Sequence, residues 1–372
     1  MSRSSTTQKS PVFSDTTVVD VDVHATIANN PKIDRAMAER LDEPWSKIYD
    51  PDVETPGAYR KTSNHGVTIP GKTHGNVQRV ADAEEDINQA LCQRFGVDYP
   101  VVNIPSLLDA HPNFDRIEPQ MRAMNEVLLD LFLDEHDHIY GAASISLHDP
   151  EASVQEIDRM AKEDKIIGVL VISAGQERAP GDPRYHRVYE AAADNDLPVL
   201  FHGFGTSSFM WNADGISRGI NEYTPHHVLG HPFSQMWPLV SMITEGVPEK
   251  YPDLNTVLLE SGIGWLPQMI SRLNREYEHR QDEMPELTKT PEEYIRDQFY
   301  LSTQPLSEFE DPRHMQEIIS IVGADSIMFS TDWPHYDLDT PETVESLLSH
   351  LSDEERAQIM HGNALEIFDI PV

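Results

Sequence analysis

The segment TVVDVDVH at residues 17–24 decides the fold class. Three β-branched residues begin it, and Asp20, Asp22 and His24 then alternate with valines. Successive side chains of a strand point to opposite faces, so the pattern predicts that these three polar residues share one face. Carboxylates on a buried strand are costly unless they are paired or bind a metal. We therefore expect a first strand that ends in a functional site.

Outward from this segment, short β-rich runs alternate with helical runs to the end of the chain. The later β-rich runs are 99–104, 139–146, 167–173, 197–203, 226–231, 255–260 and 326–331. The helical stretches are 82–95, 119–135, 150–163, 184–195, 235–246, 264–282, 311–322 and 341–350. Several β-rich runs are continuously apolar, which is typical of parallel strands buried on both faces. Eight strands alternating with helices predict an α/β fold, the (β/α)8 TIM barrel. A doubly wound sheet is the competing fold, but no Gly-rich phosphate loop follows a predicted strand.

The alternation shows no compositional break, so we expect residues 17–372 to form a single domain. Residues 1–16 lack the apolar core of a signal peptide and are expected to be a disordered arm. Two long stretches follow predicted strands: a polar insertion at 25–80 and an aromatic-rich segment at 204–225. Both would lie at the face of the barrel that carries active sites. The second is expected to be a lid or a subunit contact, and the first either a lid or a disordered insertion.

Composition limits the partners of this chain. Its 372 residues include 28 Lys and Arg against 63 Asp and Glu, a net charge of −35. Such a polyanion repels nucleic-acid phosphates and anionic membranes, so neither is expected as a partner. Acidity spread over a chain with 39% hydrophobic residues favours a halophile-type protein over an ordinary acidic cytosolic one. The single cysteine, Cys92, excludes a disulfide framework. No apolar run is long enough for a membrane span, and the expected location is the cytoplasm.

Ligand-type side chains also end later predicted strands, at His202, His231, Glu260 and Asp332. Each alone has a structural reading, such as a hydrogen-bonded histidine or, for Glu260, a loop cap. Asp20 is interpreted as a buried partner for a backbone amide or an arginine. Convergence from separate strand ends instead indicates a divalent metal site with an open position for water or substrate. The residues predicted to hold the metal are Asp22, His24, His202 and Asp332.

A set of motifs runs through the whole chain. They are VDVDVH at 19–24, LPVLFHG at 197–203, LGHPF at 229–233, LLESGIGWLP at 258–267, FSTDWPH at 329–335 and MHGNALEIF at 360–368. Together they resemble the amidohydrolase-related family. Within it, the chain looks most similar to the branch that contains aminocarboxymuconate-semialdehyde decarboxylase and related aromatic-acid decarboxylases.

This resemblance implies a distorted (β/α)8 barrel with one catalytic divalent metal at its mouth. It assigns the four metal ligands to the positions named above. The histidine that follows the sixth strand in the family, which acts on the substrate, falls on His231. Binuclear branches of the superfamily use a lysine that ends the fourth strand. The run IIGVLVIS at 166–173 has none, which favours a single metal.

Two departures from the family pattern bear on the chemistry. Asp22 stands where a histidine is more frequent, so the ligands are two carboxylates and two imidazoles; zinc is expected, with manganese as the alternative. Related decarboxylases often carry an arginine after the first strand to hold the substrate carboxylate, and Arg60 is the candidate here, with Arg35 and Arg40 in the same stretch. The segment after His231 also lacks a glutamate that some decarboxylases carry three residues later.

Three classes of function remain open. The favoured one is decarboxylation of a small unsaturated or aromatic carboxylic acid at the metal. The alternative is hydrolysis of an ester, lactone or amide by metal-bound hydroxide, with Asp332 as proton carrier and His231 polarising the carbonyl. The third is a non-catalytic metal-binding scaffold, for which loss of a ligand would be the mark; none appears lost.

Aromatic and weakly charged segments suggest where substrate and partner subunits would lie. Phe209 and Trp211 are predicted to wall the substrate pocket, or else to cover the barrel mouth or a dimer contact. Family members are commonly dimers or larger homo-oligomers. The least charged helices, 235–246 and 264–273, are the candidate interface, unless they simply pack on the barrel.

The remaining polar and aromatic candidates are given supporting roles. Trp333 and His335 would orient Asp332 or a metal-bound water, with packing as the alternative for Trp333. His226 and His227, at the start of the predicted sixth strand, would face the wrong end of the barrel to be ligands. Asn363 would shape the turn before the last helix.

Overall fold

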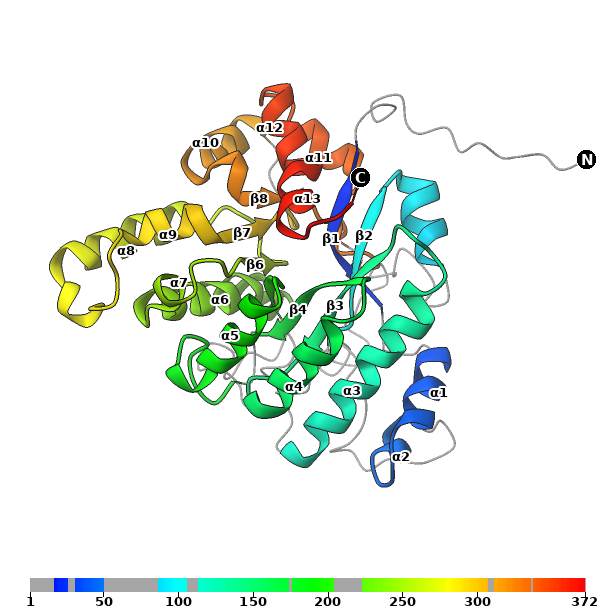
Figure 1. Cartoon of the computed structure of the whole chain (residues 1–372). Coiled ribbons are helices and arrows are strands. Elements are labelled where there is room, and N and C mark those ends of the chain that lie inside the picture. The colour runs from blue at the N-terminus through cyan, green and yellow to red at the C-terminus, as the bar shows by residue number, and fades with distance from the viewer. Residues whose placement is uncertain are drawn as a thin grey trace, which may run out of the picture.

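The computed structural model describes residues 17–25, 31–49, 86–105, 113–173, 176–203, 223–306, 311–335 and 337–371. Eight parallel strands follow one another in sequence order around a barrel, with the helices outside them (Figure 1). The strands are β1 (Val19–His24), β2 (Tyr99–Asn103), β3 (Tyr140–Ile145), β4 (Ile166–Ile172), β5 (Val199–His202), β6 (Thr256–Leu259), β7 (Phe299–Ser302) and β8 (Ile327–Met328). The predicted barrel is confirmed.

The barrel closes between the segment after β8 and β1. The amide of Val21 donates to the carbonyl of Phe329 at 3.1 Å, and the amide of His24 donates to that of Trp333 at 2.8 Å. Val23 and Trp333 form an isolated parallel bridge. These contacts bring the residues that follow β8 directly against the end of β1, where the ligand-type side chains lie.

The helices vary in length around the barrel. They are α1 (Pro31–Arg40), α2 (Ser46–Tyr49), α3 (Ile117–Leu128), α4 (Pro150–Met160), α5 (His186–Asp194), α6 (Tyr223–Thr244), α7 (Val247–Lys250), α8 (Leu266–His279), α9 (Pro291–Gln298), α10 (Pro312–Val322), α11 (Pro341–Leu347), α12 (Asp353–Ala357) and α13 (Asn363–Ile367). The start of α9 follows its sequence: Thr290 caps it, and Thr290 and Glu293 form a capping box.

Two layers of apolar side chains fill the fold. One is built from alternate residues of the strands, including Val101, Leu170, Leu200 and Val257. The residues between them, such as Val102, Val169, Phe201 and Leu258, belong to the layer that packs under the helices. The inner layer fills the barrel, and His202, two residues beyond Leu200, continues the inward face of β5.

An extra residue in β1 changes its pattern of alternation. Asp20 lies opposite Pro100 but Val23 lies opposite Val102, so β1 uses three residues where β2 uses two. Val21 therefore packs with the inner layer, and the inward face resumes at Asp22. The prediction that Asp20 shares the face of Asp22 and His24 is wrong for this reason.

Asp20 instead ties β1 to the segment after β8. Its carboxylate accepts hydrogen bonds from the backbone amide of Thr331 at 3.0 Å and from its hydroxyl at 2.6 Å. Burial raises the pKa of Asp20 to about 7. The interpretation of Asp20 as a buried partner of a backbone amide is confirmed.

The predicted sixth strand at 226–231 is wrong, because these residues belong to helix α6. Val228 is 61% exposed, which a buried strand would not allow. The run predicted as the seventh strand is β6, and β7 was not predicted. Strand β7 has only four residues and follows α9 directly at Phe299, so no turn signal separates the two elements.

The predicted insertion at 25–80 contains helices α1 and α2. Helix α1 lies beside α3, and its Ile33 and Met37 are fully buried. Residues 50–85 lie outside the described residues, as do the predicted arm at 1–16 and most of the segment at 204–225.

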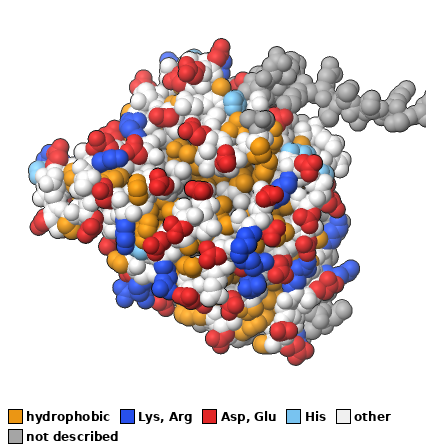
Figure 2. Space-filling view, viewed as in Figure 1, with side chains coloured by type: hydrophobic (Ala, Val, Ile, Leu, Met, Phe, Trp, Pro, Cys, Tyr) orange, Lys and Arg blue, Asp and Glu red, His pale blue; other side chains and the backbone are white. Residues whose placement is uncertain are grey.

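Other sequence expectations concern the surface. Asp and Glu side chains are scattered among Lys and Arg over the whole visible face (Figure 2). The apolar side chains of the two proposed interface helices, such as Leu239, Ile243 and Leu273, are buried within the chain, so packing on the barrel accounts for their low charge. Among the described residues, no helix is both long and apolar enough to cross a membrane.

Candidate metal centre

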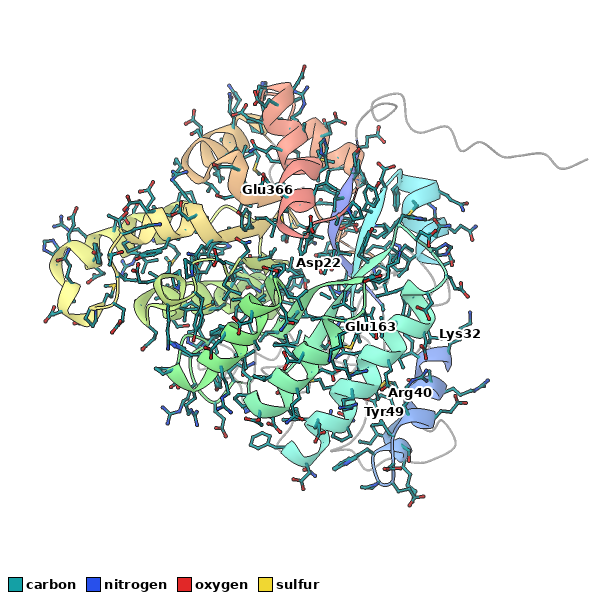
Figure 3. All side chains as sticks on the ribbon, in the orientation of Figure 1. Asp22, Lys32, Arg40, Tyr49, Glu163 and Glu366 are labelled. Atoms are coloured by element: carbon teal, nitrogen blue, oxygen red, sulfur yellow. The ribbon has the colours of Figure 1, made fainter. Side chains whose placement is uncertain are left out.

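The four predicted metal ligands converge at one end of the barrel. Asp22 and His24 come from the end of β1, His202 ends β5, and Asp332 follows β8. All four are at most 2% exposed. Asp22 lies inside the barrel, whereas Arg40 projects from α1 (Figure 3). The inward-facing strand ends thus place two imidazoles and two carboxylates around one point.

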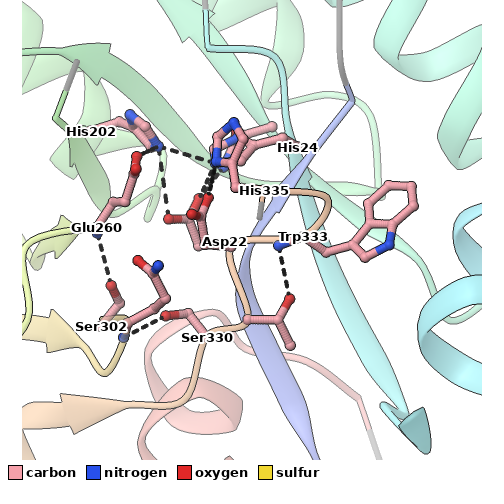
Figure 4. Close-up of polar contacts among 12 residues, drawn as sticks. Asp22, His24, His202, Glu260, Ser302, Ser330, Trp333 and His335 are labelled. Carbon is pink, nitrogen blue, oxygen red and sulfur yellow. Dashed lines mark hydrogen bonds and ion pairs between the residues drawn. The ribbon is translucent and has the colours of Figure 1, made fainter. Parts of the chain in front are cut away.

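The distances within this group are short (Figure 4). His24 Nε2 lies 2.7 Å from Asp332 Oδ1 and 3.3 Å from His202 Nε2. Asp22 completes the group, with Oδ1 3.7 Å from His24 Nε2 and Oδ2 3.8 Å from His202 Nε2. When a metal binds four such ligands at about 2.1 Å, neighbouring donor atoms lie roughly 3.0–3.4 Å apart. The spacing is close to that of a coordination shell.

Asn103, at the end of β2, orients two of the ligands. Its side-chain oxygen lies 2.7 Å from His24 Nδ1, and its amide nitrogen donates to Asp22 Oδ1 at 2.7 Å. Since the amide oxygen can only accept, Nδ1 of His24 carries the hydrogen, and a neutral ring then has its lone pair on Nε2. Asn103 was not predicted; its position at the end of a buried strand was the available signal.

These residues fit a divalent cation. Two imidazole Nε2 atoms face each other, and two carboxylates stand beside them. Asp22 Oδ2 and Asp332 Oδ2 are buried and have no hydrogen-bond partner among the described residues. Buried carboxylate oxygens of this kind are stabilised by a bound cation. The site therefore has the composition and the geometry of a divalent metal centre.

The pKa values of these side chains also favour a bound cation. Burial raises the pKa of Asp22 to about 6, against the positive charge of His24. Burial alone would lower the pKa of His24, but the carboxylates of Asp22 and Asp332 raise it to about 9. Burial and the charge of His24 hold the pKa of His202 well below its usual range. The cluster thus attracts positive charge, whether as protons or as a cation.

Asp332 is held in place by a histidine of the same loop. His335 Nδ1 lies 2.6 Å from Asp332 Oδ1. Burial would raise the pKa of Asp332, but the charges of His335 and His24 and their hydrogen bonds lower it. The contact agrees with the predicted orienting role of His335. Trp333 is 3% exposed, and its amide bonds to the Thr331 hydroxyl at 3.1 Å, which fits the packing alternative.

Glu260 reaches into the site from the end of β6. Its Oε2 lies 3.0 Å from His202 Nε2, and its Oε1 lies 3.3 Å from His231 Nδ1. Its backbone is left-handed, with φ of 52°, which a glutamate rarely adopts and which often marks functional sites. Burial and the charges of Asp332 and Asp22 raise its pKa well above the ordinary value. Glu260 is therefore part of the site and not a loop cap.

The side chain of His231 extends to the site from a helix. It lies on α6, not at a strand end, and β6 ends at Leu259. The residue that directly follows the sixth strand is Glu260, so the strand-based reason for choosing His231 was wrong even though its side chain is at the site. His227 lies one turn earlier with its ring centroid 4.8 Å from that of His231. The prediction that His227 faces the wrong end is wrong, because a helix presents both residues on one side.

Arg60, Phe209 and Trp211 lie outside the described residues, so their roles in substrate binding stay predictions. Arg40 pairs with Asp130 on the surface, away from the centre.

Asn363 begins α13. Its amide nitrogen donates to the carbonyls of Ala324 and Ile327 at 2.8 and 2.7 Å. It therefore fastens the last helix to the start of β8, where only a turn-shaping role was predicted.

Fold and site together define a metal-binding (β/α)8 barrel. The sequence profile of the Amidohydrolase family matches residues 21–370, and the chain belongs to this family.

Relatives of the chain include decarboxylases. The gamma-resorcylate decarboxylase of Polaromonas sp. is 25% identical over 304 residues, covering 77% of this chain and 87% of that protein. The 2-amino-3-carboxymuconate-6-semialdehyde decarboxylase of Dictyostelium discoideum is 22% identical over 250 residues, 66% of each protein. These matches agree with the branch that the motifs indicated.

Among solved structures, the fold is similar to that of a 5-carboxyvanillate decarboxylase from Novosphingobium aromaticivorans with bound manganese and a nitrobenzoic acid. The TM-score is 0.69 at 18% identity, covering 97% of this chain and 99% of that one.

Proposed function

We propose that this chain decarboxylates a small aromatic carboxylic acid at a divalent metal held by Asp22, His24, His202 and Asp332. The observation that carries the proposal is the convergence of these four buried side chains at the barrel mouth. Similarity to gamma-resorcylate decarboxylase and to 2-amino-3-carboxymuconate-6-semialdehyde decarboxylase supports this reaction class. An aromatic acid with a hydroxyl beside the carboxylate, such as 2,6-dihydroxybenzoate, is the first substrate to test.

The donor set supports manganese as well as zinc. Two carboxylates make the set harder than one built mainly from histidines, and hard oxygen donors suit manganese. The related manganese-bound structure supports the same choice. Manganese is therefore our first choice, with zinc as the alternative.

The chain's own side chains have distinct tasks in this reaction. When bound, the metal would supply positive charge that holds the substrate carboxylate and its neighbouring oxygen. Asp332, positioned by His335, takes the proton of the substrate hydroxyl beside the carboxylate and delivers it to the ring carbon that bears the carboxylate. The electron pair of the carbon–carbon bond then returns to the ring as carbon dioxide leaves. His231 faces the site from α6 and orients the leaving carboxylate.

A direct assay separates this reaction from hydrolysis. Protein purified in high salt and loaded with manganese is incubated with carboxyl-labelled 2,6-dihydroxybenzoate and related hydroxybenzoates, and labelled carbon dioxide is measured. Matched aryl esters and lactones serve as hydrolysis substrates. Metal-dependent carbon dioxide release supports the proposal. Ester or lactone turnover without decarboxylation of any acid would replace it with the hydrolase reading.

The assembly is inferred from the family resemblance and the location from the sequence composition. We propose a homo-oligomer, which light scattering of the purified protein in high salt would test. A cytoplasmic location is likewise a proposal.

A further inference from the structure

The side chain of Gln304 lies on the inward face of the barrel mouth. On β7, Leu301 belongs to the layer under the helices, whereas Tyr300 packs against the inner layer. Alternation then places Ser302 and, two residues further, Gln304 on the inward face. The hydroxyl of Ser302 accepts the backbone amide of Glu260 at 3.0 Å (Figure 4). The end of β7 therefore lies directly beside the metal centre.

Both neighbouring segments hold the backbone of Gln304. Its amide donates to the hydroxyl of Ser330 at 3.2 Å, and its carbonyl accepts the amide of Gly262 at 3.0 Å. Ser330 stands two residues before the proposed metal ligand Asp332, and Gly262 stands two residues after Glu260. Gln304 is thus fixed between the two segments that carry Asp332 and Glu260 into the site.

The carboxamide of Gln304 has one free hydrogen-bonding atom. The side chain is 1% exposed, and its nitrogen donates to the backbone carbonyl of Asp337 at 3.4 Å. Because a carbonyl can only accept, the nitrogen must be the atom that faces it. The other atom, Oε1, is buried and has no hydrogen-bond partner among the described residues. A buried acceptor without a donor is costly, so this oxygen has a physical reason to bind a ligand.

We propose that Gln304 contacts the substrate and selects aromatic acids whose ring carries a further hydrogen-bond donor, a hydroxyl or an amino group, besides the carboxylate and the oxygen beside it. This inference rests on the proposed function. A hydroxyl or an amino group donates its hydrogen to Oε1, whereas an ionised carboxylate has only acceptors and a plain ring edge leaves Oε1 unpaired. Gln304 therefore favours a dihydroxy acid over a monohydroxy acid and over a hydroxy diacid.

Charge in the segment after β8 also acts against a second carboxylate. Gln304 is hydrogen-bonded to this segment at Ser330 and at Asp337. The segment carries the carboxylates of Asp332, which is fully buried, and of Asp337, which is 22% exposed. A further negative charge beside them would be repelled, whereas a neutral hydroxyl or amino group would not.

Binding of unreactive analogues tests the selection without relying on turnover. In these analogues a nitro group replaces the carboxylate, so no carbon dioxide can leave. Titration calorimetry of the manganese-loaded, full-length protein in high salt compares 2-nitrophenol with three nitrodiols, 2-nitroresorcinol, 4-nitroresorcinol and nitrohydroquinone, and with 3-hydroxy-4-nitrobenzoate, which carries a second acid. We expect at least one nitrodiol to bind about tenfold or more tightly than 2-nitrophenol, and the second acid to bind more weakly than the nitrodiols.

Substitution of Gln304 assigns the effect to its carboxamide. Gln304→Met keeps the length of the side chain but has no amide oxygen. We expect it to weaken binding of the preferred nitrodiol by about 10- to 100-fold and to leave that of 2-nitrophenol within about threefold. Gln298→Met is the matched control, since Gln298 is a buried glutamine of α9 that donates to the carbonyl of Pro248 at 2.9 Å. It should leave the preference for the nitrodiol unchanged.

Two results overturn the proposal. One is a wild-type protein that binds every nitrodiol no more tightly than 2-nitrophenol, a comparison that needs no variant. The other is a folded Gln304→Met, checked by circular dichroism, that keeps the preference or loses affinity for all analogues equally. Carbon dioxide release is measured separately, so failure of this selection and failure of the proposed function are distinguishable.

Discussion

Two groups of side chains at the barrel mouth differ in how they are held. We call them the strand-borne group (Asp22, His24 and His202) and the helix-borne group (His227 and His231). Asp22, His24 and His202 lie on strands whose backbones are fixed by neighbours on both sides, and they are nearly inaccessible to solvent. His227 and His231 come from one helix that packs on the barrel and leaves them partly exposed. Sheet-borne ligands are preorganised, which suits a tightly bound catalytic metal, whereas helix-borne side chains suit a group that acts on substrate.

The largest expected effect is at Asp332. Asp332→Asn removes a charged ligand and the proposed proton donor together, so we expect decarboxylation to fall by more than about ten-thousandfold. Steady-state kinetics of the manganese-loaded variant measures this. Circular dichroism checks that the fold is kept, and retained turnover in a folded variant contradicts the assigned role.

His231 separates the two groups functionally. Because it faces the site without belonging to the strand-borne group, His231→Ala should lower kcat by roughly a hundred- to ten-thousandfold while the metal stays bound. Kinetics and metal analysis on the same sample give both quantities. Loss of the metal would mean that His231 supports the metal centre, and the comparison between the groups would then fail.

Asn103 tests the preorganisation of the strand-borne group. Asn103→Leu removes the hydrogen bonds to His24 and Asp22, so the metal should bind about 10- to 100-fold more weakly. Manganese titration against a competing chelator measures the change. An unchanged affinity would show that the strands alone orient these ligands.

Metal affinity should also depend on pH. In the metal-free protein the pKa of His24 is raised to about 9, so it is protonated at neutral pH and this proton must leave when metal binds. Affinity should therefore fall about tenfold per pH unit as pH drops below about 9, and more steeply below about 6, where Asp22 also gains a proton. Titration calorimetry in buffers of different ionisation enthalpy measures the released protons; release that does not vary between pH 6 and 9 contradicts the assignment.

The smallest effect is expected outside both groups. Thr290→Ala removes the N-cap of α9 and should cost about 1 kcal/mol of stability without changing metal content. Urea unfolding and metal analysis check the two parts. A change in metal content would show that the site depends on distant packing.

The strand-borne group was predictable because its signals are local. His202 ends a short buried strand, and alternation places it inside the barrel, whereas Asp332 lies in the segment that follows β8. Alternation predicted the wrong face for Asp20, because an extra residue in β1 reverses the alternation. Nothing in the segment itself reveals its pairing with β2. Asn103 and Glu260 matter through their partners, which only the closed barrel brings together.

The helix-borne group was less accessible to sequence reasoning. The run around Val228 resembles a short strand, and tertiary context decides that it is helical and exposed. His231 was identified through a family motif, whereas His227 was dismissed because its place on a helix was not recognised. Strand β7 was not predicted because its four residues carry too little periodicity to separate them from α9.

Decarboxylation by this chain is expected to require a metal held by the strand-borne group. Metal-free wild-type protein and its His24→Ala variant are titrated with manganese(II) chloride while carbon dioxide release from 2,6-dihydroxybenzoate and related hydroxybenzoates is followed. We expect release that begins only as manganese binds in the wild type and stays absent in a folded His24→Ala variant. Release that needs no metal, or that His24→Ala retains, would contradict this expectation.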